Sequence, residues 1–127
     1  MSEAVTRGVR VKVRSAYVPD RSDPDEDFYF FAYRVVIDNE GTVPVKLISR
    51  HWIITDGTGH AEEVKGPGVV GEQPLLAPGE SYAYTSACPL PTPVGSMHGS
   101  YQMVSANGER FDARIAPFTL ACPNAIN

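Results

Sequence analysis

The segment Phe28-Tyr29-Phe30-Phe31-Ala32-Tyr33-Arg34-Val35-Val36-Ile37 is the strongest β-strand signal in the chain. It consists mostly of aromatic and β-branched residues, which suit the pleated backbone of a sheet. Every second side chain is apolar, so one face of the strand holds Tyr29, Phe31, Tyr33, Val35 and Ile37. The turn residues Asn39-Glu40-Gly41 follow. We therefore expect a strand with one buried face that ends at this turn.

Similar patterns lie before and after this segment. Residues 9–17 alternate valines with Arg and Lys, which predicts one apolar face and one basic face. Residues 45–55 carry apolar side chains on both faces, which predicts a central strand covered on both sides near its end, with Arg50 and Trp52 on one face. Further strands are expected at residues 61–65, 81–86, 99–104, 111–115 and, after a bend at Pro117, 118–120.

Composition points to an all-β fold. Eleven glycines and eleven prolines are spread along 127 residues and leave little room for long helices. About seven strands at turn spacings of roughly eight to twelve residues are typical of an antiparallel β-sandwich of the immunoglobulin or fibronectin type III kind. We expect one domain over residues 1–127 with frayed ends at residues 1–7 and 121–127. Trp52 should be buried between the sheets with Tyr33, Val35 and Tyr101.

Charge and cysteine content exclude several function classes. The net charge of -4 and the pI of about 5.3 argue against nucleic acid as a partner. No apolar run approaches the roughly twenty residues of a membrane span, and no secretory signal is present. Cys88 and Cys122 lack the spacing of a zinc site or a disulfide framework. These features indicate a cytoplasmic protein with reduced thiols.

The segment Gly66-Pro67-Gly68-Val69-Val70-Gly71-Glu72-Gln73-Pro74 has the G-x-G-x-x-G spacing of dinucleotide-binding loops. Those loops need a following helix, and Pro74 and Pro78 leave no room for one. Two interpretations remain. Backbone N–H groups of residues 68–71 could form an anion-binding nest, or the glycines could serve a tight connection with positive φ. The candidate ligand-binding residues of the first interpretation are Gly66, Gly68, Val69, Val70, Gly71 and Arg50.

Charge around this glycine loop favours the structural interpretation. Lys65 would attract a polyphosphate, but Glu62, Glu63 and Glu72 would repel it. We therefore expect ATP to bind with a dissociation constant on the order of millimolar, if it binds.

Other residues offer weaker chemical signals. Five acids in residues 20–27 could attract a hard cation, yet the segment lacks an EF-hand pattern, so we expect a solvated loop. The three histidines have no ligand spacing, and we expect neither a tight cobalt nor a tight magnesium site. Residues 95–99, Gly-Ser-Met-His-Gly, resemble a nucleophile elbow only loosely, so we expect a loop and no catalysis.

Six segments together resemble the ApaG family. They are FAYRVVIDN (residues 31–39), LISRHWIITD (47–56), VKGPGVVGEQP (64–74), LAPGE (76–80), TPVGSMHGSY (92–101) and IAPFTL (115–120). The resemblance implies a fibronectin type III-like sandwich in a bacterial protein. It also implies an operon shared with a diadenosine tetraphosphate hydrolase and a loose link to cobalt and magnesium resistance. Related eukaryotic domains, in an F-box protein and a polymerase-interacting protein, resemble interaction modules, and the family has no agreed activity.

Two functions follow as hypotheses. The first is a non-catalytic, regulatory module that recognises another protein, which should show an exposed apolar patch or a bare sheet edge. The second is a nucleotide or polyphosphate binder, linked to cobalt and magnesium homeostasis, which should show a pocket with converging N–H groups. An enzyme is the third and least favoured reading, and no cofactor is expected.

Overall fold

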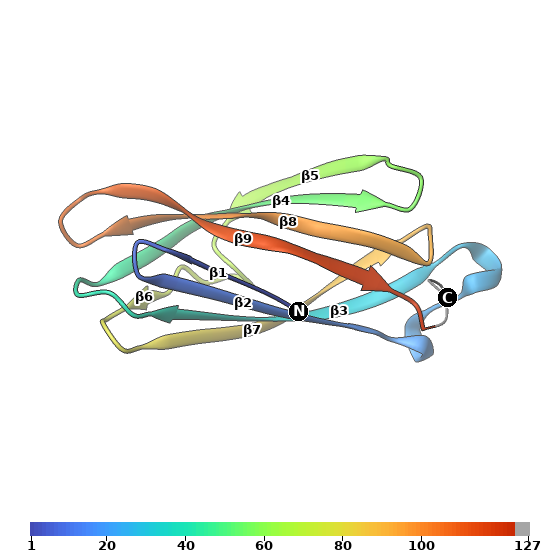
Figure 1. The fold of residues 1–127 in the computed structure, drawn as a ribbon, viewed down its shortest axis with the longest axis horizontal. Coiled ribbons are helices and arrows are strands. Elements are labelled where there is room, and N and C mark those ends of the chain that lie inside the picture. Colours follow the sequence, from blue (N-terminus) through green and yellow to red (C-terminus); the bar gives the residue numbers. More distant parts are fainter. Residues whose placement is uncertain (124–127) are drawn as a thin grey trace.

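The computed structural model describes residues 1–123, which form an antiparallel β-sandwich of two sheets (Figure 1). The first sheet has the order β1-β2-β3-β7. Its strands are β1 (Ser2–Thr6), β2 (Val9–Tyr17), β3 (Tyr29–Asn39) and β7 (Ser81–Leu90). The second sheet has the order β5-β4-β8-β9, and β6 pairs with one end of β4. Its strands are β4 (Val45–Asp56), β5 (Ala61–Pro67), β6 (Leu75–Leu76), β8 (Val94–Ser105) and β9 (Arg110–Ala121).

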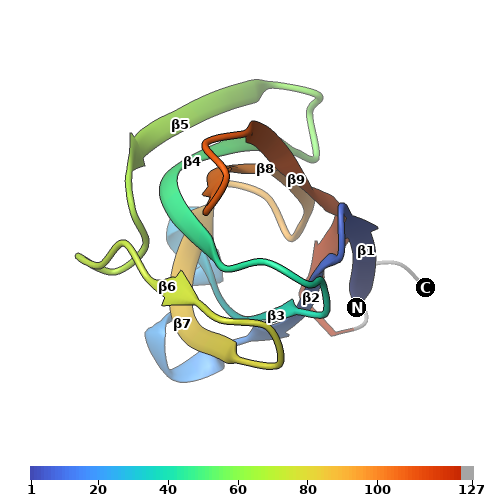
Figure 2. The same cartoon turned by 90° about the vertical axis from the view of Figure 1, so that its left-hand side faces the viewer.

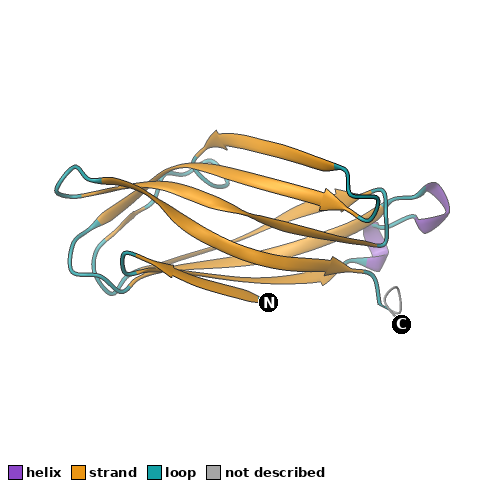
Figure 3. Ribbon diagram, turned by 45° about the horizontal axis from the view of Figure 1, so that its top comes forward, coloured by secondary structure: helices purple, strands orange, loops and turns teal. Residues whose placement is uncertain are grey.

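The helical content of the described chain is small. Two 3-10 turns, η1 (Pro19–Arg21) and η2 (Pro24–Glu26), join β2 to β3 at one end of the sandwich (Figure 3). No helix among residues 1–123 is long and apolar enough to cross a membrane. The predicted fold class is confirmed, with nine strands in the described residues where the sequence indicated about seven.

The core lies between the two sheets, which face each other in the end-on view (Figure 2). The alternation predicted for β2 and β3 is confirmed, because their apolar faces are almost fully buried. The predicted burial of Trp52 is confirmed as well: its exposed fraction is 2%, and its ring packs edge-on against Tyr33, with 5.4 Å between centroids. Tyr101 and Phe118 pack against the same ring from β8 and β9.

A β-bulge explains why β4 carries apolar residues on both faces. The register with β8 shifts between Leu47 and Ser49, so Ile48 is an extra residue in β4. Before the bulge Val45 and Leu47 point into the core, and after it Trp52 does. The expected central position of β4 is confirmed, and its residues after the bulge are buried or half-buried on both faces. The bulge also exchanges the two faces along the strand, which contributes to the mixed apolar pattern.

Several element boundaries differ from the sequence expectations. Residues 2–6 form β1, paired with β2 through a two-residue turn in which Arg7 and Gly8 both have positive φ, of 49° and 80°. The expected fray at residues 1–7 was therefore wrong. β8 begins at Val94 and absorbs residues 95–99, which were expected as a loop. Pro117 lies at a register irregularity of β9, as predicted, while residues 124–127 of the expected C-terminal fray lie outside the described residues.

Candidate functional site

Two of the three glycines of the G-x-G-x-x-G segment serve the chain's own packing, and the third serves a left-handed turn. A Cβ on Gly66 would lie 2.9 Å from Nη2 of Arg50, so the guanidinium lies flat against this glycine. Gly68 has φ of +59°, and its Cβ would lie 2.2 Å from the carbonyl oxygen of Glu72. Gly71 has φ of +82° and open space around it. The close approach that a pyrophosphate makes in nucleotide loops is made here at Gly68 by the protein's own backbone.

The N–H groups near Gly68 donate within the protein. Gly68 donates to the carbonyl of Ile48 at 2.9 Å, and Val69 donates to that of Glu72 at 2.8 Å. Glu72 returns a hydrogen bond to Val69 at 2.9 Å, which closes a tight turn around Val70 at φ of 42° and Gly71. Among residues 1–123 no helix follows Gly71, as expected. Val69 is buried in the core, whereas Val70 is exposed, so these two candidates point into different environments.

Arg50 is the candidate residue with the most distinctive surroundings. It is half-buried, and its Nη1 donates to the carbonyls of Pro67 at 2.9 Å and Gly68 at 3.0 Å. None of the ion pairs within residues 1–123 involves it. The guanidinium is therefore held in place by neutral oxygens, and its positive charge has no carboxylate partner in the described part of the chain.

Arg50 lines a cleft between the two sheets. The cleft has a volume of about 430 Å³ and is bounded by strands β4 and β5 on one side and β7 on the other. Strand alternation places Arg50, Trp52 and Ile54 on the cleft wall, and the facing wall includes Tyr33 and Cys88. The sequence correctly placed Arg50 beside Trp52. It missed the contribution of β7, because that depends on which strands lie at the rim of each sheet.

Two titratable groups of the cleft wall, Cys88 and Tyr33, are shielded from water. Burial raises the pKa of the Cys88 thiol to about 11, and the charge of Glu62 adds to the shift. Burial likewise raises the pKa of the Tyr33 phenol, against a hydrogen bond with Ser86 that lowers it. Both groups are therefore protonated at neutral pH. The indole Nε1 of Trp52 finds no hydrogen-bond acceptor among the described residues.

β7 forms one rim of the cleft and is the last strand of its sheet, so one of its edges pairs with no strand of residues 1–123. The backbone N–H of Asn39 donates to the carbonyl of Glu80, so these two residues form a hydrogen-bonded pair. In an antiparallel ladder every second pair is hydrogen-bonded, so the even-numbered residues of β7 bond to β3. The odd-numbered residues of β7 therefore direct their N–H and C=O groups to the free edge. Pro89, which has no N–H, occupies one of these positions without loss of a ladder bond.

Strand β7 itself contains no charged residue. No Asp, Glu, Lys or Arg occurs between Glu80 and Glu109. The outward side chains of the strand are small and exposed: Ser81, Ala83, Thr85, Ala87 and Pro89. Proteins commonly place charges, prolines or bulges on exposed edges to prevent pairing with other chains. Apart from Pro89 near its end, β7 lacks these protections over its length.

The edge of β5, across the cleft, is protected in the usual way. It is shorter than β7 and exposed on both faces, and Glu62, Glu63 and Lys65 lie along it. Pro67 ends it. The two edges that flank the cleft therefore differ: β5 resists strand pairing, and β7 permits it.

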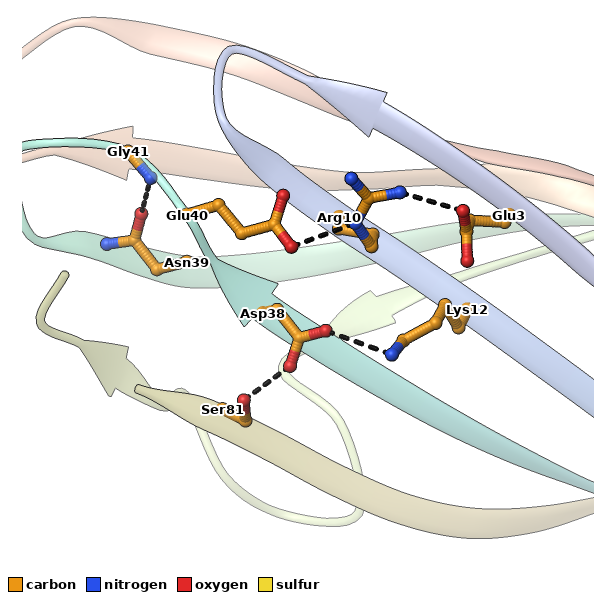
Figure 4. Close-up of polar contacts among 8 residues, drawn as sticks. All are labelled: Glu3, Arg10, Lys12, Asp38, Asn39, Glu40, Gly41 and Ser81. Atoms are coloured by element: carbon orange, nitrogen blue, oxygen red, sulfur yellow. Dashed lines mark hydrogen bonds and ion pairs between the residues drawn. The ribbon is translucent and has the colours of Figure 1, made fainter. Parts of the chain in front are cut away.

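Several charged side chains on the outer face of the first sheet pair with one another (Figure 4), whereas Arg14 and Arg34 lie opposite each other there without an ion pair among residues 1–123. Arg10 donates to Glu3 at 2.7 Å and to Glu40 at 2.9 Å, and the hydrogen bond from Arg10 lowers the pKa of the Glu40 carboxyl. Lys12 lies 3.4 Å from Asp38, which also accepts a hydrogen bond from Ser81. These groups satisfy one another and leave little net charge for a ligand.

The remaining sequence candidates do not converge. Residues 20–27 form the exposed turns η1 and η2, where Arg21 stacks over the ring of Phe30. Ser96 and His98 lie inside β8, so no strand-to-helix elbow exists there. Within residues 1–123 no three His, Cys, Asp or Glu side chains gather as a metal-binding group would.

Comparison with known proteins finds close relatives. Residues 19–105 match the ApaG domain family. Protein ApaG of Azoarcus sp. (strain BH72) is 56% identical over 127 residues, with both chains covered completely. Protein ApaG of Azotobacter vinelandii is 54% identical over 119 residues, 94% of each chain.

Solved structures agree with this fold. An ApaA protein from Bordetella pertussis superposes with a TM-score of 0.90 at 56% identity, covering 92% of this chain and 95% of that one. The C-terminal domain of wzt superposes with a TM-score of 0.56 at 10% identity, covering 94% of this chain and 76% of that one. The second likeness concerns the fold alone.

Proposed function

The chain belongs to the ApaG domain family, and we propose that it is a non-catalytic module that binds another protein by pairing an extended segment of that protein with the free edge of β7. One observation carries the proposal: β7 is a ten-residue edge strand without a charged side chain, whereas the neighbouring edge β5 is charged. Its two free cysteines accord with a place in the reducing cytoplasm.

Backbone pairing would supply the affinity of this interaction. The N–H groups of Ala83, Thr85 and Ala87 point to the free edge, and no hydrogen bond of the described residues uses them. An extended segment of about seven residues could pair along this edge, since strands rise about 3.3 Å per residue in either chain. The small outward side chains would not obstruct its approach.

A second copy of this chain suits the site less well than a foreign segment. The inward side chains of β7, such as Tyr84, Cys88 and Leu90, are already buried in the core of their own molecule. Two copies joined edge to edge would therefore bring no side chain to fill the adjacent cleft. A foreign strand would present every second side chain to it.

Nucleotide binding receives less support from the geometry. Gly68 and Val69 use their N–H groups within the chain, and a protein carbonyl occupies the space beside Gly68. We therefore keep weak, millimolar-range nucleotide binding as the expectation.

Selection from a random nine-residue peptide library displayed on phage tests the proposal. The enriched peptides are then assayed by fluorescence anisotropy against the wild-type protein and two variants. Ala87→Pro removes an N–H that points to the free edge of β7, as Pro89 already does two residues later. Glu63→Pro is the matched control, because it removes an N–H that points to the free edge of β5. We expect Ala87→Pro to weaken binding at least about tenfold, because a backbone hydrogen bond is lost and the ring obstructs pairing, and Glu63→Pro to leave it unchanged.

Three results would overturn the proposal: no enriched peptide, binding that survives Ala87→Pro, or a protein that self-associates through β7. The unfolding midpoint of each variant, followed by Trp52 fluorescence, shows whether it is folded. If Ala87→Pro unfolds the protein, amide chemical shifts of the wild-type protein decide. Peptide-induced shifts should then concentrate at residues 83–89, and shifts elsewhere would contradict strand pairing.

A further inference from the structure

We propose that Arg50 binds an acidic side chain of the bound segment, two residues away from an apolar side chain that packs against Val64, which lies opposite Trp52. This inference rests on the proposed function, because it concerns the side chains of a strand added to β7. It assigns Arg50 as a specificity-determining residue and describes the partner by its chemistry.

The first step is geometric. A strand that extends the first sheet beyond β7 has side chains that point alternately to the outer face and toward the second sheet. The side chains that point toward the second sheet enter the cleft of about 430 Å³ that lies between β7 and strands β4 and β5. The added strand would thus cover the cleft and fill it with every second side chain.

The second step concerns the order of groups along the cleft. After its bulge, β4 presents Arg50, Trp52 and Ile54 to the cleft, two residues apart, which is about 6.6 Å per step. On β5, Gly66 lies opposite Arg50, Val64 opposite Trp52, and Glu62 opposite Ile54. The cleft therefore has a cationic end beside the glycine loop and an apolar centre. An extended segment has the same two-residue repeat, so neighbouring inward side chains meet neighbouring groups.

The third step concerns the charge of Arg50. Its guanidinium rests on Gly66, and only Nη1 has hydrogen-bond partners, the carbonyls of Pro67 and Gly68. Nη2 and Nε have no acceptor among the described residues, and no carboxylate of residues 1–123 forms an ion pair with the group. The half-buried guanidinium is therefore held in place while its Nη2 and Nε donors have no acceptor among the described residues. A carboxylate is the group that best satisfies such a planar donor array.

The glycine loop acquires a role in this arrangement. Its carbonyls fix the direction of the guanidinium, and the absence of a side chain at Gly66 provides the surface on which it rests. The loop would thus position a cation for a protein ligand, in place of binding an anion through its own N–H groups.

The experiment uses matched peptides derived from the library selection described above. One peptide contains Asp two residues from Phe or Leu, and its partner contains Asn in place of Asp. The measured quantity is the ratio of their dissociation constants, by anisotropy, for wild-type protein, Arg50→Lys and Arg50→Gln. We expect the Asp peptide to bind wild-type protein at least about fivefold more tightly, in keeping with a charge-assisted hydrogen bond.

The variants distinguish two roles of Arg50: binding the carboxylate of the peptide, and holding the glycine loop through the carbonyls of Pro67 and Gly68. Arg50→Lys keeps the charge and should retain part of the preference for Asp, whereas Arg50→Gln should reduce the ratio to about one. A purely structural role of Arg50 would lower the affinity for both peptides and leave the ratio unchanged, which would overturn the inference. An enriched library without Asp or Glu two residues from an apolar residue would overturn it as well. Peptides that lose binding with Ala87→Pro but show no acid preference would leave strand pairing intact and remove only the role of Arg50.

Discussion

Replacement of Gly68 by alanine tests whether the glycine spacing serves packing. Gly68 has φ of +59°, a region that residues with a Cβ adopt at a cost. The added methyl group would lie 2.2 Å from the carbonyl oxygen of Glu72, a backbone atom that cannot turn aside as a side chain would. Gly71 supplies a matched control, because its φ is +82° and no atom lies within 4 Å of its Cβ position.

The two substitutions should differ by the cost of the collision. An alanine in the left-handed backbone region destabilises the folded state by about 1–2 kcal/mol. Alanine also restricts the unfolded chain more than glycine does, which offsets about 0.4–1 kcal/mol of this loss. For Gly68→Ala, Glu72 must also move, which disrupts its two hydrogen bonds with Val69, at about 1 kcal/mol each. We expect Gly68→Ala to lower the free energy of unfolding by about 2–4 kcal/mol and Gly71→Ala by about 1 kcal/mol.

Thermal and urea unfolding followed by Trp52 fluorescence measure the difference. At about 4 °C per kcal/mol for a domain of this size, Gly68→Ala should lower Tm by about 8–16 °C. The reasoning would be refuted if Gly68→Ala were no more destabilising than Gly71→Ala. A Gly68→Ala protein of normal stability that had lost saturable ATP binding would point instead to a nucleotide loop.

Two further predictions concern the core. Trp52→Ala should lower the free energy of unfolding by about 3–5 kcal/mol, because the ring is 2% exposed, and an unchanged urea midpoint, read by circular dichroism, would contradict its place in the core. Burial raises the pKa of the Cys88 thiol and of the phenols of Tyr84 and Tyr101, whose hydroxyls share a hydrogen bond. In the unfolded chain these groups lose their protons at a lower pH than in the folded chain. Stability should therefore be level up to about pH 8 and then fall, by about 1.4 kcal/mol per pH unit for each group ionised only when unfolded. Urea midpoints between pH 7 and 10.5 check the sign, and a rising midpoint above pH 9 would be inconsistent with it.

The strands and their faces could be predicted from the sequence, because side-chain alternation is a local property. The pattern of residues 29–37 identifies β3 and its buried face without knowledge of any neighbour. The burial of Trp52 could likewise be predicted, because it is the single Trp in a chain of short strands. The proline after the glycine loop excluded a helix, since that depends only on the proline ring.

The candidate site depends on contacts between residues far apart in the chain. The β7 edge is free because β7 lies last in its sheet, which no local pattern reveals. The bulge at Ile48 turns Arg50 and Trp52 toward the cleft, because one extra residue reverses which side chains face the core. The sequence pattern alone does not reveal this reversal. Arg50 finds its carbonyl partners 17 and 18 residues away. Local alternation thus determined which residues form strands and which faces they bury. Sheet order and register decided which edge has no partner strand, and which charge has no carboxylate partner, among residues 1–123.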